Sequence, residues 1–193
     1  MAQTYTQDNF FDRNDFSQVP LAKGDYENYT FKNCNFANND LSDFKFMGCE
    51  FDGCNLSLTK LDKTALRDIK FKDCKMLGLR FDTCNEFGLS FAFENCKLNH
   101  SSFYMTNIKK TIFKNSQLQE VDFTECDLTS AVFQNCDLTQ ASFKNTNIEK
   151  VDFRTAYNYS INLEINRAKN AKFSILDIAG LLDKYDIEIE HSK

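Results

Sequence analysis

Residues 121–143 read VDFTECDLTSAVFQNCDLTQASF, and every fifth position of this stretch holds a large apolar residue: Phe123, Leu128, Phe133, Leu138 and Phe143. A period of five matches neither the 3.6-residue period of an α-helix nor the two-residue period of a strand. A chain that turns a corner every five residues points one large side chain inward on each short side, and stacked coils then form a continuous core. The stretch therefore predicts a solenoid.

The five-residue period covers most of the chain in two runs. Fifteen consecutive positions from Phe11 to Phe81 and thirteen from Phe93 to Phe153 are large and apolar. A phase slip of two residues separates the runs at residues 84–92, where Glu86 stands in the apolar slot. We expect a bulge or small loop there, with Glu86 expelled from the core and Gly88 easing the turn. The alternative interpretation is a corner insertion that only decorates one side.

Small residues precede the apolar positions by two places, and this slot contains every cysteine of the chain. The eight cysteines are Cys34, Cys49, Cys54, Cys74, Cys84, Cys96, Cys126 and Cys136. A single shared register predicts small buried side chains rather than a disulfide framework or a zinc site. The N-terminal residues contain no signal-peptide pattern, so we expect reduced thiols and a cytoplasmic location.

The five-residue units identify a family resemblance. Cys34–Asn38, Cys126–Ser130 and Cys136–Gln140 resemble the small–polar–Leu/Phe–polar–polar unit of pentapeptide-repeat proteins, and the resemblance extends over about residues 11–173. It implies an all-β solenoid: a right-handed quadrilateral parallel β-helix with four units per coil. Alternation of Phe with Leu or Ile along the second run agrees with four sides. At twenty residues per coil, residues 11–173 are expected to form about eight coils.

The ends of the chain depart from the repeat. Residues 1–10 are expected to form an N-terminal cap or a disordered segment. Residues 174–193 are expected to form a short C-terminal α-helix and a short strand, with Ser174 as the helix N-cap. One apolar stripe of this helix is predicted to form a homodimer interface; it consists of Ile175, Ile178, Leu181, Leu182 and Tyr185. The alternative is a monomeric cap over the last coil.

The sequence contains no recognisable catalytic constellation. Only two histidines exist, His100 and His191, and no glycine-rich phosphate loop or nucleophile motif is present. The acidic residues occupy outward positions of a convex rod, which lacks the cleft that paired catalytic carboxylates require. We therefore expect a non-enzymatic protein without a metal or cofactor. A net charge of −5 argues against nucleic-acid binding through a basic surface, and no apolar run approaches a membrane span.

The tail and the size of the chain resemble those of the Qnr-type and mycobacterial fluoroquinolone-resistance proteins. This resemblance implies binding to type II topoisomerases, DNA gyrase and topoisomerase IV, by a rod that mimics DNA, and quinolone resistance as the outcome. The candidate partner-binding residues form one acidic region: Glu120, Asp122, Glu125, Asp127, Asp137 and Asp152. Lysines such as Lys110 and Lys144 interleave with them. The alternative function is a general protein-interaction scaffold, which a mottled rather than continuously negative surface would favour.

Overall fold

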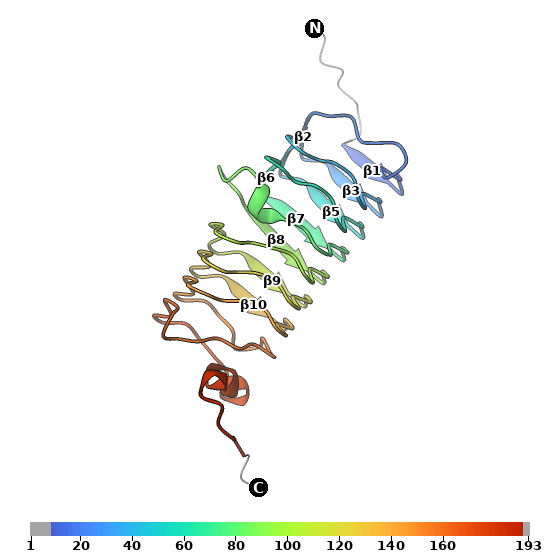
Figure 1. Cartoon of the computed structure of the whole chain (residues 1–193). Helices are drawn as coiled ribbons and strands as arrows, with labels where there is room; N and C mark the ends of the chain where they lie inside the picture. The colour runs from blue at the N-terminus through green and yellow to red at the C-terminus, as the bar shows by residue number, and fades with distance from the viewer. Residues whose placement is uncertain (1–8, 191–193) are drawn as a thin grey trace.

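A computed structural model gives the structure of the protein and describes residues 9–190. The chain forms one rod of stacked coils, with the two termini at opposite ends (Figure 1). Residues 1–8 of the expected N-terminal cap, and residues 191–193 of the expected C-terminal segment, lie outside the described part.

Two parallel sheets form the regular sides of the rod. The long sheet has the order β1-β3-β5-β7-β8-β9-β10 and the short sheet the order β2-β4-β6. The strands of the long sheet are β1 (Phe10–Asp12), β3 (Thr30–Lys32), β5 (Glu50–Asp52), β7 (Ile69–Lys72), β8 (Phe91–Glu94), β9 (Ile112–Lys114) and β10 (Val132–Gln134). The strands of the short sheet are β2 (Asp25–Glu27), β4 (Lys45–Met47) and β6 (Ala65–Arg67).

The register between neighbouring strands confirms the predicted parallel β-solenoid. Phe31 pairs with Phe51 and Phe113 with Phe133, so one coil takes twenty residues, or four units of five. The coil count differs slightly from the expected eight: the seven strands of the long sheet span six turns, and only isolated bridges such as Asp152–Lys172 continue the ladder beyond β10. Strand pairing weakens there because the repeat itself decays towards the C-terminus.

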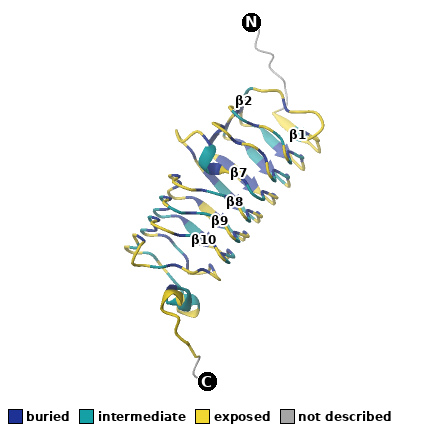
Figure 2. Cartoon of the chain, in the orientation of Figure 1, coloured by how far each residue is buried: buried dark blue, intermediate teal, exposed yellow. Residues whose placement is uncertain are grey.

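Phenylalanine rings fill the inside of the rod in two stacks. Phe103 and Phe123 stack with ring centroids 5.3 Å apart, and Phe113 and Phe133 stack at 4.8 Å on the opposite side. Phe113 meets Phe123 edge to face at 5.9 Å, an arrangement that aromatic pairs prefer to a face-to-face sandwich. Buried residues accordingly follow the inner side of every coil, and exposed residues mark the corners (Figure 2).

The small residue two places before each inward apolar side chain binds the coil above. The Cys54 thiol donates to the carbonyl oxygen of Phe31 at 3.1 Å, and the Thr59 hydroxyl donates to that of Phe36 at 2.8 Å. Thr146 makes the same bond to Phe123 at 2.8 Å. Cys, Ser and Thr fit this slot because they are small and can also donate a hydrogen bond, so their hydroxyl or thiol is satisfied inside the core.

The corners place every fifth residue in the left-handed region. Asn115, Glu120 and Glu125 have φ values of 50°, 56° and 57°. Asparagine tolerates this conformation, whereas most other side chains adopt it at a cost. At the Gly48 corner a Cβ atom would lie 2.5 Å from the side-chain oxygen of Asn28, so a larger residue there would require the Asn28 side chain to move.

The phase slip is a loop of the predicted kind. A 3-10 turn, η1 (Phe81–Thr83), precedes it, and the step from Phe71 to its partner Phe93 is twenty-two residues instead of twenty. Glu86 is exposed, as predicted, and Leu89 joins the core in its place. Phe87 projects outward with 76% of its surface exposed, 5.0 Å from the Arg67 guanidinium.

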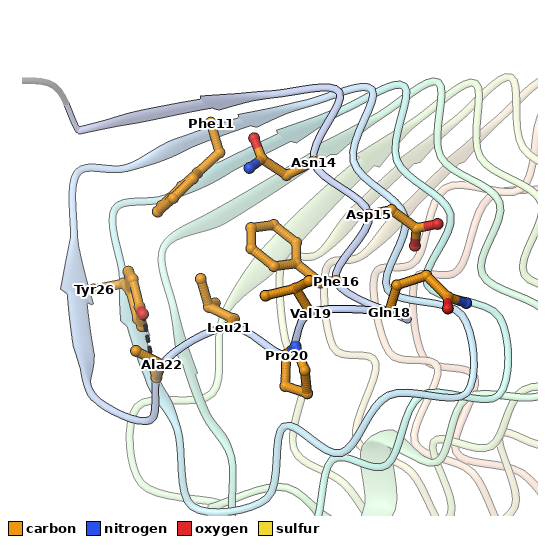
Figure 3. A pocket seen from close by; sticks show the side chains of 10 residues that line it. All are labelled: Phe11, Asn14, Asp15, Phe16, Gln18, Val19, Pro20, Leu21, Ala22 and Tyr26. Carbon is orange, nitrogen blue, oxygen red and sulfur yellow. Dashed lines mark hydrogen bonds between the residues drawn. The ribbon is translucent and has the colours of Figure 1, made fainter.

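The N-terminal end of the described rod is open. Phe11, Phe16, Leu21 and Tyr26 surround the end of the core, and a cavity of about 510 Å³ lies between them and the segment that contains Pro20 (Figure 3). Tyr26 closes one side of this cavity through a hydrogen bond from its hydroxyl to the carbonyl oxygen of Ala22.

The C-terminal end differs from the prediction in several respects. Continuing the five-residue steps from Phe153 predicts Asn158 and Leu163 at inward positions. The core takes Tyr159 and Ile161 instead, because the chain leaves the five-residue register after Phe153. The expected α-helix is a pair of 3-10 helices, η2 (Ile175–Leu181) and η3 (Asp183–Tyr185). Ser174 is the N-cap of η2, as predicted, and its hydroxyl oxygen accepts the Leu176 N–H at 3.1 Å.

The tail is attached to the last coil through its backbone. Ile161 N–H donates to the carbonyl oxygen of Gly180 at 2.9 Å, and the Leu181 side chain is buried against the core. This attachment fits the tighter 3-10 winding, which is common in short helical pieces. Residues 186–190 form no strand, because no neighbouring strand is available to them within the described chain. No helix in residues 9–190 has the length and apolarity needed to cross a membrane.

Candidate functional site

The six acidic residues predicted to bind a partner do not form one face. The four aspartates lie on four different sides of the rod, because each belongs to a different ladder of stacked positions. These ladders are Ser102–Asp122–Ser142, Asn107–Asp127–Asn147, Gln117–Asp137–Tyr157 and Val132–Asp152–Lys172. The acidic region is therefore a belt around the rod, and no flat partner surface can contact all six at once.

All four of these aspartates cap the next corner of their own coil, Asp152 by accepting the Arg154 N–H at 3.1 Å. Asp122 accepts the Thr124 N–H at 2.9 Å, whereas Asp127 and Asp137 each accept both the N–H and the hydroxyl of the threonine two residues on. Such Asx turns satisfy the backbone at a corner. The aspartate before the apolar position thus has a structural role that the sequence analysis did not assign.

Hydrogen bonds also reduce the availability of these carboxylates. Burial alone would raise the pKa of Asp137, but hydrogen bonds from Thr139 and Gln119 outweigh it and lower this pKa below its ordinary value. Hydrogen bonds from the Arg154 guanidinium lower the pKa of Asp152. Arg154 Nη2 and Asp152 Oδ2 form an ion pair at 2.7 Å. Both carboxylates stay ionised at neutral pH, yet part of their charge is compensated within the chain.

Glu120 and Glu125 are the two predicted residues that project freely from corners. Both residues are exposed, and their left-handed backbone holds them at the outer edge of successive sides. Glu120 lies 3.3 Å from the imidazole Nδ1 of His100, one coil above, and Glu125 has no ion pair among the described residues. These two are the best-placed candidates for an external partner.

Charge is distributed along the rod in bands. Residues 9–59 contain eight acidic and four basic side chains, residues 60–114 contain six and eleven, and residues 115–165 contain eight and three. The middle third is therefore positive, and both flanking thirds are negative. The net charge of −5 conceals this basic middle band.

The outer surface of the long sheet alternates in charge from coil to coil. The aligned positions Asp12, Lys32, Asp52, Lys72, Glu94 and Lys114 form this ladder. Lys114 and Glu94 form an ion pair at 2.7 Å. Opposite charges on adjacent strands attract each other, so this side is close to neutral. It lacks the continuous negative stripe of a DNA mimic.

The predicted dimer residues separate into buried and exposed sets. Leu181 is buried against the last coil and Leu182 is half-buried. Ile175, Ile178 and Tyr185 remain exposed, the first to 84% of its surface, and Leu176, which the predicted stripe excluded, is 80% exposed. The end of the rod therefore presents an apolar surface composed partly of predicted residues and partly of Leu176.

All eight cysteines are buried and unpaired. Burial raises the pKa of the Cys136 thiol to about 12, and it also raises the pKa of Cys126 to about 12. Within residues 9–190, no three His, Cys, Asp or Glu residues are close enough together to hold a metal ion. Six of the eight thiols donate to backbone carbonyl groups instead, and the Cys126 sulfur lies 3.4 Å from the Thr106 hydroxyl oxygen.

These thiols are expected to be unreactive in the native protein. The thiolate is the nucleophilic form, and a raised pKa together with burial suppresses it at neutral pH. Cys136 and Cys126 should react with a chromogenic disulfide reagent much more slowly in the native protein than in denaturant. Rapid native labelling of these residues would contradict their burial.

Comparison with known proteins supports the assignment of the fold. The family model described as "Pentapeptide repeat region" matches residues 89–163. A trypsin-treated form of QnrB1, described as a plasmid-mediated fluoroquinolone resistance protein, superposes with a TM-score of 0.64 at 14% identity and covers 94% of this chain and 99% of its own. Full-length QnrB1 gives a TM-score of 0.57 at 15% identity, over 92% and 97% of the two chains.

No curated protein sequence matches this chain. The identities to the solved structures are low, so these likenesses establish the fold alone. The twenty-residue coil, the small-slot hydrogen bonds and the family match nevertheless agree with one another. Residues 89–163 thus match the pentapeptide-repeat family, and the β-solenoid of the whole described chain is similar to that of QnrB1.

Proposed function

We propose that this protein acts without catalysis, by binding a type II topoisomerase through the acidic third of its rod. The observation on which this rests is the exposed pair Glu120 and Glu125, in a segment with eight acidic and three basic side chains. The topoisomerase as partner follows from the family resemblance. An acidic, convex rod complements the basic surface on which such an enzyme binds duplex DNA.

The charge pattern limits how this binding works. Residues 115–165 have the largest negative excess, and within the described chain their corner carboxylates Glu120 and Glu125 form no ion pair with a lysine or arginine, whereas the corner carboxylate of Asp43 in residues 9–59 is paired with Lys23; the proposed contact is therefore local. Asp127 and Asp152 contribute less, because Lys109 lies 3.2 Å from the first and Arg154 2.7 Å from the second. The mimicry is therefore restricted to one end of the molecule.

A gyrase supercoiling assay with ciprofloxacin tests this function. The wild-type protein should change the extent of supercoiling or of quinolone inhibition, and the double variant Glu120→Lys/Glu125→Lys should lose most of that effect. Lysine is tolerated at such corners, since Lys110 and Lys150 already occupy left-handed positions. Exposed substitutions of this kind usually change stability by less than about 0.5 kcal/mol, so loss of fold is not expected.

The matched control is the variant Asp43→Lys/Asp68→Lys. Both aspartates are exposed, left-handed corner residues outside the acidic third. This control should keep the wild-type effect. Equal loss in the two double variants would show that general charge, and not the acidic third, governs the assay.

A general interaction scaffold is the second candidate. The alternating ladder of the long sheet and the positive middle band favour it, because a mixed surface suits a protein partner better than it imitates DNA. The two functions differ in the assay above: a scaffold with another partner leaves the topoisomerase unaffected.

We also propose that the protein is a homodimer through its C-terminal end. The exposed Ile175, Leu176 and Ile178 would be covered in such a dimer, and isologous contacts of this kind are the commonest in soluble oligomers. The burial of Leu181 makes it a poor test residue, since its substitution disturbs the attachment of the tail itself.

Ile175→Asp/Leu176→Asp is expected to yield a monomer. Both side chains are at least four-fifths exposed in the single chain, so the fold should remain while a charge at the interface opposes association. Light scattering measures the mass, and circular dichroism checks the fold. A wild-type protein that is monomeric at high concentration would refute the dimer.

A further inference from the structure

The backbone hydrogen-bond ladder between coils is interrupted at the phase slip. One coil further along, Met105 N–H donates to Thr124 at 3.0 Å, Ile108 N–H to Asp127 at 3.0 Å, and Asp127 N–H to Thr106 at 2.9 Å. Among the hydrogen bonds of residues 9–190, none joins residues 83–90 to residues 104–109. The two coils therefore lack backbone hydrogen bonds to each other between residues 83–90 and 104–109.

The interruption follows from the loop above it. Thr83 directs its N–H group back to Arg80 at 3.3 Å within the η1 turn, whereas Met105, the corresponding residue of the next coil, donates to Thr124. The carbonyl group of Tyr104, and both the N–H and the carbonyl group of Asn107, have no backbone partner in the described chain. Unpaired groups of this kind form an exposed strand edge. This edge lies in the middle of the rod, between coils that are otherwise paired with their neighbours.

A surface notch lies at this edge. Its volume is about 480 Å³, within the range of ~300–1,000 Å³ typical of ligand-binding clefts. Its lining comes from both coils: Phe81, Asp82, Cys84, Glu86 and Leu89 on one side, and Tyr104, Met105, Thr106 and Asn107 on the other. Tyr104 and Met105 are exposed, to 39% and 61% of their surfaces.

The charges of the notch have one sign. Its lining includes the carboxylates of Asp82 and Glu86 and no basic side chain. Asp82 forms an ion pair with Arg80, whereas Glu86 is exposed and has no ion pair among the described residues. An occupant therefore needs a cationic side chain for Glu86, an apolar side chain for the surface of Leu89 and Met105, and a backbone that can pair with Asn107.

We propose that the notch binds an extended, basic segment of a partner protein by β-augmentation. The backbone of this segment would pair with the free N–H and carbonyl groups of Asn107, a Lys or Arg would face Glu86, and the alternate side chain would contact Leu89 and Met105. Strand addition to an exposed edge combines backbone affinity with side-chain specificity in this way. The notch lies outside the acidic third, so this site is independent of the proposed topoisomerase contact.

Hydrogen exchange tests the edge itself. The amide of Asn107 should exchange much faster than that of Asp127, which occupies the same ladder position one coil further and donates to Thr106. Equal protection of the two amides would show that the ladder is closed, and it would overturn the proposal before any ligand is added.

The binding probe is a blocked heptapeptide with alternating valine and lysine. In isotope-labelled protein it should shift the amide resonance of Asn107 and slow its exchange, while Asp127 stays unchanged. A matched peptide with glutamate in place of lysine should bind at least about tenfold more weakly, a difference of ~1.4 kcal/mol.

Two variants assign the binding to the notch. Asn107→Pro removes the free N–H; proline fits there because Pro20 already occupies the same position of a five-residue unit, directly before the inward apolar residue. Glu86→Lys, on an exposed loop residue, removes the carboxylate without affecting the core. Each variant should reduce the affinity for the lysine peptide about tenfold or more, whereas Glu120→Lys should leave this affinity unchanged.

Three results would contradict the proposal. They are the absence of shifts at Asn107, equal weakening by Glu120→Lys and Glu86→Lys, and shifts at Asn107 that grow with protein concentration in the absence of peptide. The last result would assign the notch to a second copy of the chain.

Discussion

Phe123→Ala is expected to destabilise the protein by about 3–5 kcal/mol, the usual cost of truncating a fully buried aromatic side chain. Phe123 has no exposed surface and stacks between Phe103 and Phe143, at centroid distances of 5.3 and 5.2 Å. Its removal leaves a cavity that the neighbouring coils cannot close, because their spacing is set by the backbone ladder. Chemical denaturation measures the loss.

Phe87→Ala is the matched control for this prediction. The residue type is the same, but Phe87 lies on the outer loop with 76% of its surface exposed. Its removal costs only the contact with Arg67, so the change in unfolding free energy should stay below about 1 kcal/mol. Similar losses in the two variants would mean that the inward assignment of the five-residue register is wrong.

Gly180→Ala is expected to displace the C-terminal tail. A Cβ atom at this position would lie 1.9 Å from the carbonyl oxygen of Tyr159, and a backbone atom cannot yield as a flexible side chain does. The tail must therefore shift, which breaks the bond from Ile161 N–H to Gly180 and uncovers Leu181. Overpacking of this kind typically costs about 1–3 kcal/mol.

Hydrogen exchange at the amide of Ile161 reports this displacement directly. The amide should lose protection in Gly180→Ala, while Asp183→Ala, an exposed substitution in η3, should leave it protected. Unchanged protection in Gly180→Ala would contradict the close contact between the tail and the last coil.

The repeat made most of the fold predictable from the sequence. The period of five identified Phe103, Phe123 and Phe143 as one stack, and the shared slot of the cysteines predicted their burial. The prediction is wrong where the period weakens. Five-residue steps place the polar Asn158 in the core, but its neighbour Tyr159 occupies that position. A pattern read at fixed steps cannot register a local slip of one residue.

The candidate site was less predictable for two physical reasons. Neighbours in the sequence were treated as neighbours in space, although in a twenty-residue coil Asp122 and Asp137 lie on different sides. Counting positions in steps of twenty would have revealed this. By contrast, the open edge at Asn107 depends on where the inserted residues direct their N–H groups, which the sequence does not specify.

Direct binding of the wild-type protein to DNA gyrase and topoisomerase IV tests the central claim most directly. The account predicts binding at low ionic strength that weakens as salt rises, because exposed corner carboxylates such as Glu120 and Glu125 interact through screened charges. Because lysines interleave with the acids and the acidic excess is confined to one third of the rod, the salt dependence should be modest. Absence of binding to both enzymes even at low ionic strength would contradict the account and leave the interaction scaffold as the function.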